Sequence, residues 1–254
     1  LFFRAEVRGR MLVHGDDFIL LATAAEIVRV FALLSSKYTV KLVGKIGPGC
    51  QNSELVILNR VVKFVDLPGA ARRVELEADQ RHAHLLVKAL GLQTAKTAET
   101  PRAKHTEEVC LDALTSPVLS AADSTLYRSC VMWANYLGQD RMGIQEAVKC
   151  LSQHMVAPTD FDMTELKRLA RFVKKFPRAV LLFRRQRLAK FLDAWSDSDN
   201  AGDAVTRRSA TGLVLQIGEH TTRTAAHLQS LIGLSSGEAE FYACVSACRA
   251  ALHL

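Results

Sequence analysis

The stretch MLVHGDDFILLA, residues 11–22, places two adjacent aspartates between two apolar runs. Met11 to Val13 and Phe18 to Ala22 have the composition of β-strands, and the four residues between them, 14–17, fit a tight hairpin connection. Neighbouring carboxylates repel each other, and burial disfavours their charged form. An exposed turn tip explains the pair, and so does a bound cation. The residues alone leave both interpretations open.

Further strands and helices are predicted on either side of this hairpin. Thr23 to Glu26 reads as a capping box that starts a helix, and Gly91 is placed to end another. Residues 1–7 add a strand before the hairpin. The remaining elements predicted before residue 92 are strands at 54–58 and 61–65 and a helix at 78–90.

The middle of the chain is predicted to be helical. Residues 92–119 lack periodicity and read as a linker. Helices follow from 120, at 144–154 and at 163–176, and their apolar residues recur at helical spacing. The residues predicted to face inward are Tyr127, Cys130, Val131 and Ala134 in the first helix, and Leu166, Leu169, Ala170 and Val173 in the last.

From residue 190 the pattern changes back to strands. Strands are predicted at 190–196, 211–217 and 221–228, and a second capping box at Ser235 to Glu238 opens a helix that runs to the end.

Composition narrows the class of protein. The chain has 254 residues, 49% of them hydrophobic, but no apolar run of the roughly 18 residues that a membrane span needs. Because it begins with Leu1, we expect it to be part of something longer. The six cysteines show no zinc-like spacing. This cysteine usage favours a reducing, intracellular compartment, either cytoplasmic or nuclear.

Positive charge is concentrated in one stretch. The net charge is +7, and residues 165–190 hold ten Lys or Arg and one acidic residue, so this stretch carries +9 and the rest −2. Such a strip suggests a polyanionic partner, although an ordinary solvated helix face explains it equally well. The candidate nucleic-acid-binding residues are Lys167, Arg168, Arg171, Lys174 and Lys175.

A second pair of carboxylates lies near the end of the chain. Asp197 is predicted at the end of a strand, and Glu240 in the first turns of the last helix. Carboxylates from a strand end and a neighbouring helix can converge on one divalent cation, and hard oxygen ligands suit Mg²⁺. We therefore predict two metal sites, at Asp16 and Asp17 and at Asp197 and Glu240.

Four stretches resemble one protein family. MLVHGDDFILLA is similar to the YVDD hairpin of reverse transcriptases. GQDRMGIQEAVKCLSQHMVAPTDFDMTELKRLARFVK (138–174) resembles the segment after the polymerase in copia-type retrotransposon Pol polyproteins. WSDSDNAGDAVTRRSATGLVLQIG (195–218) and LSSGEAEFYA (234–243) resemble the start of their RNase H domain.

The resemblance implies an α+β fold in four parts. They are a partial reverse-transcriptase palm of antiparallel strands and helices (1–91), a linker (92–119), a helical connection with the basic strip (120–189), and the N-terminal half of an RNase H-like domain with a truncated mixed sheet (190–254). Asp16 and Asp17 match the metal-binding aspartates of the polymerase, and Asp197 and Glu240 match carboxylates of RNase H. The implied cofactor is Mg²⁺, with Mn²⁺ as an alternative.

Both implied sites are incomplete. The family's third polymerase aspartate would precede Leu1, and a further RNase H aspartate would follow Leu254. RNA-directed DNA synthesis with hybrid degradation is therefore the family activity, and we expect the isolated chain to be inactive. The alternative is a non-catalytic remnant that binds nucleic acid. The expected partners are an RNA–DNA hybrid or template–primer, and the remaining Pol segments or a second chain.

Overall fold

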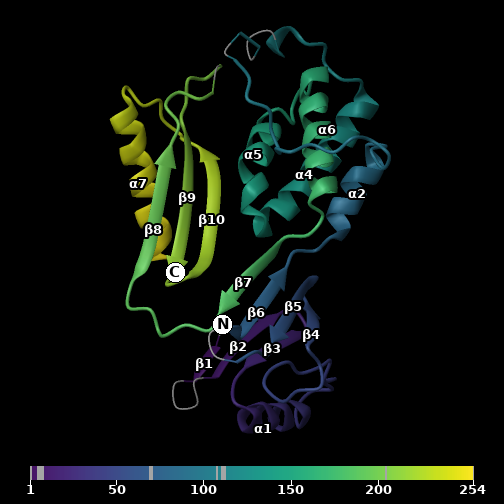
Figure 1. Ribbon diagram of the computed structural model, residues 1–254, viewed down its shortest axis with the longest axis vertical. Coiled ribbons are helices and arrows are strands. Elements are labelled where there is room, and N and C mark those ends of the chain that lie inside the picture. The colour runs from purple at the N-terminus through teal and green to yellow at the C-terminus, as the bar shows by residue number, and fades with distance from the viewer. Residues whose placement is uncertain are drawn as a thin grey trace. The chain divides into compact units, whose positions relative to one another are not determined.

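The protein was analysed as a computed structural model, which describes residues 2–4, 9–68, 71–106, 108–109, 113–203 and 205–253. The chain divides into two compact units, residues 1–44 and 45–254, which are described separately (Figure 1). Both combine helices with antiparallel strands, which confirms the α+β class. The unit boundary after Gly44 lies inside the predicted palm segment 1–91, and the predicted domain boundaries stay predictions.

The first unit is a three-stranded antiparallel sheet followed by a helix. Its strands are β1 (Phe2–Arg4), β2 (Gly9–His14) and β3 (Asp17–Leu21), in that order, and α1 runs over Ala24–Ser35. Thr23 begins α1 because its hydroxyl accepts a 3.3 Å hydrogen bond from the Glu26 amide. The Glu26 carboxylate accepts two bonds from Arg29, at 2.8 and 2.6 Å. The predicted helix start is therefore confirmed.

The second unit begins with a four-stranded antiparallel sheet. The order is β4 (Glu54–Ile57), β5 (Arg60–Val65), β6 (Arg73–Glu77) and β7 (Val180–Arg184). Only β4 and β5 were predicted from the sequence. The pairing of β6 with β7 is reinforced by Arg178, whose guanidinium donates to both carboxylate oxygens of buried Glu77 at 2.8 and 2.7 Å. This ion pair lowers the pKa of Glu77.

Four helices form the largest core of the second unit. They are α2 (Arg81–Ala89), α4 (Ala121–Asp140), α5 (Gln145–Gln153) and α6 (Asp160–Lys175), with short 3₁₀ turns at Ala113–Thr115 and Met142–Ile144. Gly91 ends α2 with a φ of +65°, a backbone conformation that favours glycine. All eight residues predicted to face inward from α4 and α6 are fully buried in one cluster, which confirms the helical pattern.

The last part of the second unit is a three-stranded sheet with one helix on it. The strands β8 (Leu192–Ser198), β9 (Ala210–Ile217) and β10 (His220–Leu228) pair antiparallel with β9 in the middle, and α7 (Ser236–Leu252) packs on β8 and β9 (Figure 1). These pairings are all antiparallel, so the parallel part of the expected mixed sheet has no counterpart among the described strands. No described helix is both long and apolar enough to cross a membrane.

Candidate functional site

Asp16 and Asp17 lie at the tip of the β2–β3 hairpin. Gly15 takes the first position of the two-residue loop with a φ of +57°, as a tight hairpin turn requires. Asp17 pairs with His14 as the first residue of β3. Both aspartate side chains are exposed, so their charges are solvated. Asp16 and Asp17 are neighbours in the chain at this tip. Carboxylate oxygens are the donor type that Mg²⁺ prefers. Cation binding there stays a prediction.

Asp197 lies in a strand of the last sheet, and Glu240 lies in the helix that packs on that sheet. In β8, Ser196 pairs with Leu213, which is buried under α7, whereas Asp197 pairs with Gly212. Because side chains alternate along a strand, Asp197 projects from the face of the sheet away from α7. Glu240 is exposed on α7 itself. The structure describes no contact between the two carboxylates, and their sharing of one cation stays a prediction.

A buried glutamine, which the sequence pattern did not indicate, connects the end of β8 with the start of α7. The Gln229 amide nitrogen donates to Thr211 at 3.0 Å and to the Ala239 carbonyl at 2.9 Å, and it reaches the Ser198 hydroxyl at 3.4 Å. Gln229 therefore fixes the end of β8 to the first turn of α7. Ser198 adjoins Asp197, and Ala239 adjoins Glu240. A lone glutamine between a strand and a turn gives no sequence signal of this role.

The carboxylates that flank the predicted ligands have structural partners. Asp199 accepts a hydrogen bond from the Ala210 amide. Glu238 accepts from the Leu234 amide at 2.8 Å and from the Tyr242 hydroxyl at 2.6 Å, and the Tyr242 bond is the main cause of its lowered pKa. Among the residues that the structure describes, no group of three or more His, Cys, Asp or Glu side chains is placed to hold a metal ion.

Most of the predicted basic face of α6 contacts the protein itself. Lys174 donates to the Ala95 carbonyl at 2.6 Å, Lys175 binds Glu99, and Arg168 donates to Thr100 at 2.9 Å. These three partners belong to the predicted linker, which therefore runs along α6. Of the other two predicted residues, Lys167 is exposed and Arg171 is half-buried.

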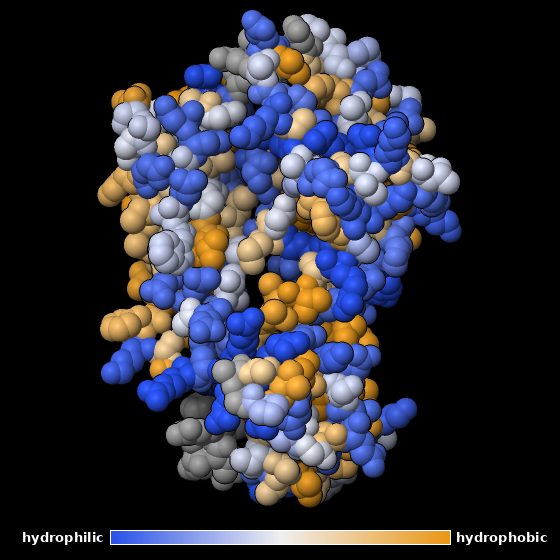
Figure 2. Space-filling view, in the orientation of Figure 1, coloured by the Kyte–Doolittle hydropathy of each residue, from blue (hydrophilic) through white to orange (hydrophobic). Residues whose placement is uncertain are grey.

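A second group of cations lies at the end of β7 and in the connector that leads from it to β8. Its members are all exposed, and no side-chain partner is found for them within the described residues: Arg184, Arg185, Arg187 and Lys190. We call these four residues the basic connector. Figure 2 shows hydrophilic side chains projecting from the surface where this connector runs in Figure 1. The sequence strip was predicted as one feature, but its connector half is the more accessible.

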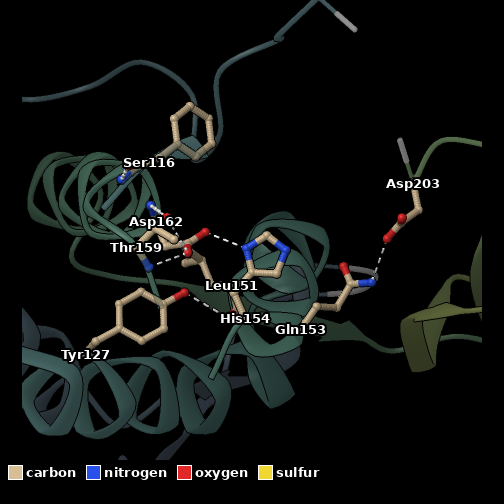
Figure 3. Close-up of polar contacts among 9 residues, drawn as sticks. Ser116, Tyr127, Leu151, Gln153, His154, Thr159, Asp162 and Asp203 are labelled. Atoms are coloured by element: carbon tan, nitrogen blue, oxygen red, sulfur yellow. Dashed lines mark hydrogen bonds and ion pairs between the residues drawn. The ribbon is translucent and has the colours of Figure 1, made fainter. Parts of the chain in front are cut away.

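A histidine–aspartate pair lies where α5 meets α6 (Figure 3). His154 Nδ1 is 2.5 Å from Asp162 Oδ1, and the other Asp162 oxygen accepts from the Thr159 amide at 2.7 Å and hydroxyl at 2.8 Å. The Asp162 hydrogen bond raises the pKa of His154. Burial raises the pKa of Asp162, but the bonds from His154 and Thr159 outweigh it, so that pKa is lowered. Asp162 completes the capping box of α6, which indicates a structural role.

A cavity of about 500 Å³ adjoins this pair. Several of its titratable lining groups contact one another. His105 Nε2 lies 3.2 Å from Glu165 Oε1, and Cys150 donates to Glu146 at 3.1 Å. Burial raises the pKa of Cys150 to about 12, so the thiol stays protonated and is a poor nucleophile. Among the lining residues that the structure describes, no nucleophile–base arrangement is formed.

The known proteins that resemble this chain include two retrotransposon polyproteins. The chain is 32% identical over 240 residues to the retrovirus-related Pol polyprotein from transposon RE2 of Arabidopsis thaliana. The aligned region makes up 92% of this chain and 15% of that protein. The chain is also 32% identical over 154 residues to the corresponding polyprotein from transposon RE1, covering 58% of this chain and 10% of that protein. The chain thus spans a small part of both polyproteins.

A third relative is an uncharacterised mitochondrial protein of Arabidopsis thaliana, 34% identical over 122 residues, which make up 48% of this chain and 50% of that protein. No family model matches the sequence. No solved structure matches it either.

Proposed function

From the distant homology of this chain to copia-type retrotransposon Pol polyproteins, we propose that it is a section of such a polyprotein whose own activity is to bind nucleic acid. In this proposal, residues 1–91 correspond to the end of a reverse transcriptase, 120–189 to the connection, and 190–254 to the start of an RNase H-like domain. Its partner is an RNA–DNA hybrid or a template–primer duplex inside the cell.

The paired aspartates at the hairpin tip support the reverse-transcriptase part of the proposal. Asp16 and Asp17 would hold Mg²⁺, which supplies the positive charge that phosphoryl transfer needs when it is bound. The glycine turn at Gly15 keeps both carboxylates exposed at the end of a two-stranded ribbon. That position leaves them open to a phosphate-bearing ligand.

The basic connector is the observation that carries nucleic-acid binding. Arg184, Arg185, Arg187 and Lys190 are exposed and unpaired within the described residues, so they can contact phosphates without first breaking an ion pair. The cations of α6 differ, because Lys174 and Lys175 would have to leave Ala95 and Glu99. We therefore assign the main phosphate contacts to the connector.

Hybrid cleavage by this chain alone is the competing function. Asp197 and Glu240 would have to bind Mg²⁺ together, but alternation along β8 directs Asp197 away from α7. A catalytic site that lacks one of its members loses nearly all of its rate. We therefore propose binding without cleavage.

One pair of assays tests this function. Fluorescence anisotropy with a labelled RNA–DNA hybrid should show binding whose log affinity falls linearly with log salt, because each phosphate contact releases a counterion. The same hybrid incubated with the protein and Mg²⁺ should keep its RNA strand intact. No binding at low salt would contradict the binding proposal, and Mg²⁺-dependent RNA fragments would contradict the absence of cleavage.

A further inference from the structure

Helix α7 has two apolar faces. The inner face consists of Ala239, Ala243, Ala247 and Ala250, all buried toward the β8–β9–β10 sheet. At 100° per residue, a second stripe lies on the opposite side of the helix. Its members are Phe241, Val245, Cys248 and Leu252, which we call the outer stripe. A helix that serves only to cover a sheet needs one apolar face, so the outer stripe calls for a partner of its own.

The outer stripe is open to solvent in the second unit. Phe241, Val245 and Leu252 are 64%, 50% and 88% exposed. Figure 1 shows α7 as the outer layer of its sheet, and Figure 2 shows apolar surface along that side of the molecule. Single exposed apolar residues are common, but four in line along one helix mark an interaction site.

We propose that the outer stripe is the contact surface of a homodimer in which α7 packs antiparallel against α7 of a second copy. The stripe is symmetric about a point between Cys244 and Val245. A twofold axis there sets Phe241 against Cys248 of the partner subunit and brings the two Val245 side chains together. Leu252 then falls beside Gly237 of the partner subunit, where the absence of a Cβ leaves room.

Charge favours the antiparallel direction. Glu238 and Arg249 flank the stripe on the same side of the helix, near its two ends. In the antiparallel pair, Arg249 lies beside Glu238 of the partner subunit, and the symmetry repeats this contact. A parallel pair would instead keep Arg249 and Glu238 of the partner subunit at opposite ends of the contact. The same symmetry therefore satisfies both the apolar and the charged positions.

The contact is small, which sets the expected affinity. The outer stripe covers roughly three turns of one helix, so its area lies at the low end for specific interfaces. We therefore expect a reversible dimer with a dissociation constant on the order of micromolar.

Sedimentation velocity on the full chain, without nucleic acid, tests the dimer. Over a dilution series from about 100 to 1 μM, the wild type should shift from dimer to monomer, as a micromolar constant requires. Phe241→Glu should be monomeric throughout, since it buries a charge within the apolar contact. Leu188→Glu is the matched control, because Leu188 is 96% exposed outside the stripe, and it should dimerise as the wild type does. Circular dichroism verifies that both variants fold.

Cysteine cross-linking tests the direction of the pair. Antiparallel helices 8–10 Å apart bring the two Cys244 side chains close to disulfide distance, whereas parallel helices would bring the two Cys248 side chains together. In a Cys50→Ser background, mild oxidation should give a covalent dimer that Cys244→Ser abolishes and Cys248→Ser retains. A monomeric wild type, dimerisation of Phe241→Glu, or cross-linking that depends on Cys248 would each overturn the proposal. None of these results depends on whether the chain binds nucleic acid.

Discussion

The basic face of α6 and the basic connector carry similar charge in the sequence but differ in the structure. Three cations of α6 hold residues 95–100 against the helix. The four cations of the connector extend into solvent without a described side-chain partner. Local charge density therefore does not tell which cations are available to a polyanion. Availability depends on whether another segment has already paired with them.

The α6 cations can hold residues 95–100 in place only if α6 itself is anchored in the core. Leu169 is fully buried in the helical cluster, and Leu169→Ala leaves a cavity there. We expect it to lower the free energy of unfolding by about 2–5 kcal/mol, measured by chemical denaturation. Leu188→Ala, at an exposed site in the connector, should change it by less than about 0.5 kcal/mol. Equal losses at the two sites would refute the core position of α6.

Within α6, Lys174 contacts the linker and Lys167 is exposed, so the two lysines should differ in their contribution to stability. Lys174→Met removes the hydrogen bond to the Ala95 carbonyl while keeping the length of the side chain, and should cost about 1 kcal/mol of stability. Lys167→Met, on the exposed side of the same helix, is the control and should be nearly neutral. If both variants were neutral, the linker would not depend on this contact.

The His154–Asp162 pair between α5 and α6 should have a smaller, pH-dependent effect on the stability of the fold. The pKa of His154 is raised in the folded chain, so its protonated form stabilises the fold below the unfolded pKa of about 6.5. That contribution is lost as the pH rises through the folded pKa. Thermal melts should therefore show a larger fall in melting temperature between pH 6 and pH 9 for the wild type than for His154→Gln. Parallel pH profiles would show that the pair contributes no linkage.

Local patterns in the sequence predicted the helices but not their long-range partners. The buried face of α6 follows from helical spacing alone. By contrast, the partners of Lys174 and Arg168 lie 79 and 68 residues upstream, in a segment without periodicity. Strand β7 was missed for the same reason: its five residues sit inside a basic run, and it pairs with β6 about a hundred residues earlier, as the Glu77–Arg178 contact across 101 residues shows.

The candidate sites show the same limit. The hairpin that carries Asp16 and Asp17 is a local structure, and the glycine turn made it predictable. The relation of Asp197 to Glu240 depends on which face of β8 packs under α7, and residue order does not fix that register. Gln229, which holds the two elements together, gives no sequence pattern because each of its contacts is made across a turn or between elements.

The most direct measurement compares two triple variants that remove equal charge: Arg184→Gln, Arg185→Gln and Arg187→Gln in the connector, and Lys167→Gln, Lys174→Gln and Lys175→Gln on α6. Binding of a labelled RNA–DNA hybrid is measured across a salt series. The connector variant should bind about tenfold more weakly or worse, and the slope of log affinity against log salt should fall by about 2–3 units. The α6 variant should change that slope by less than about one unit. The reverse result, with binding lost in the α6 variant and kept in the connector variant, would contradict the assignment of the phosphate contacts to the connector.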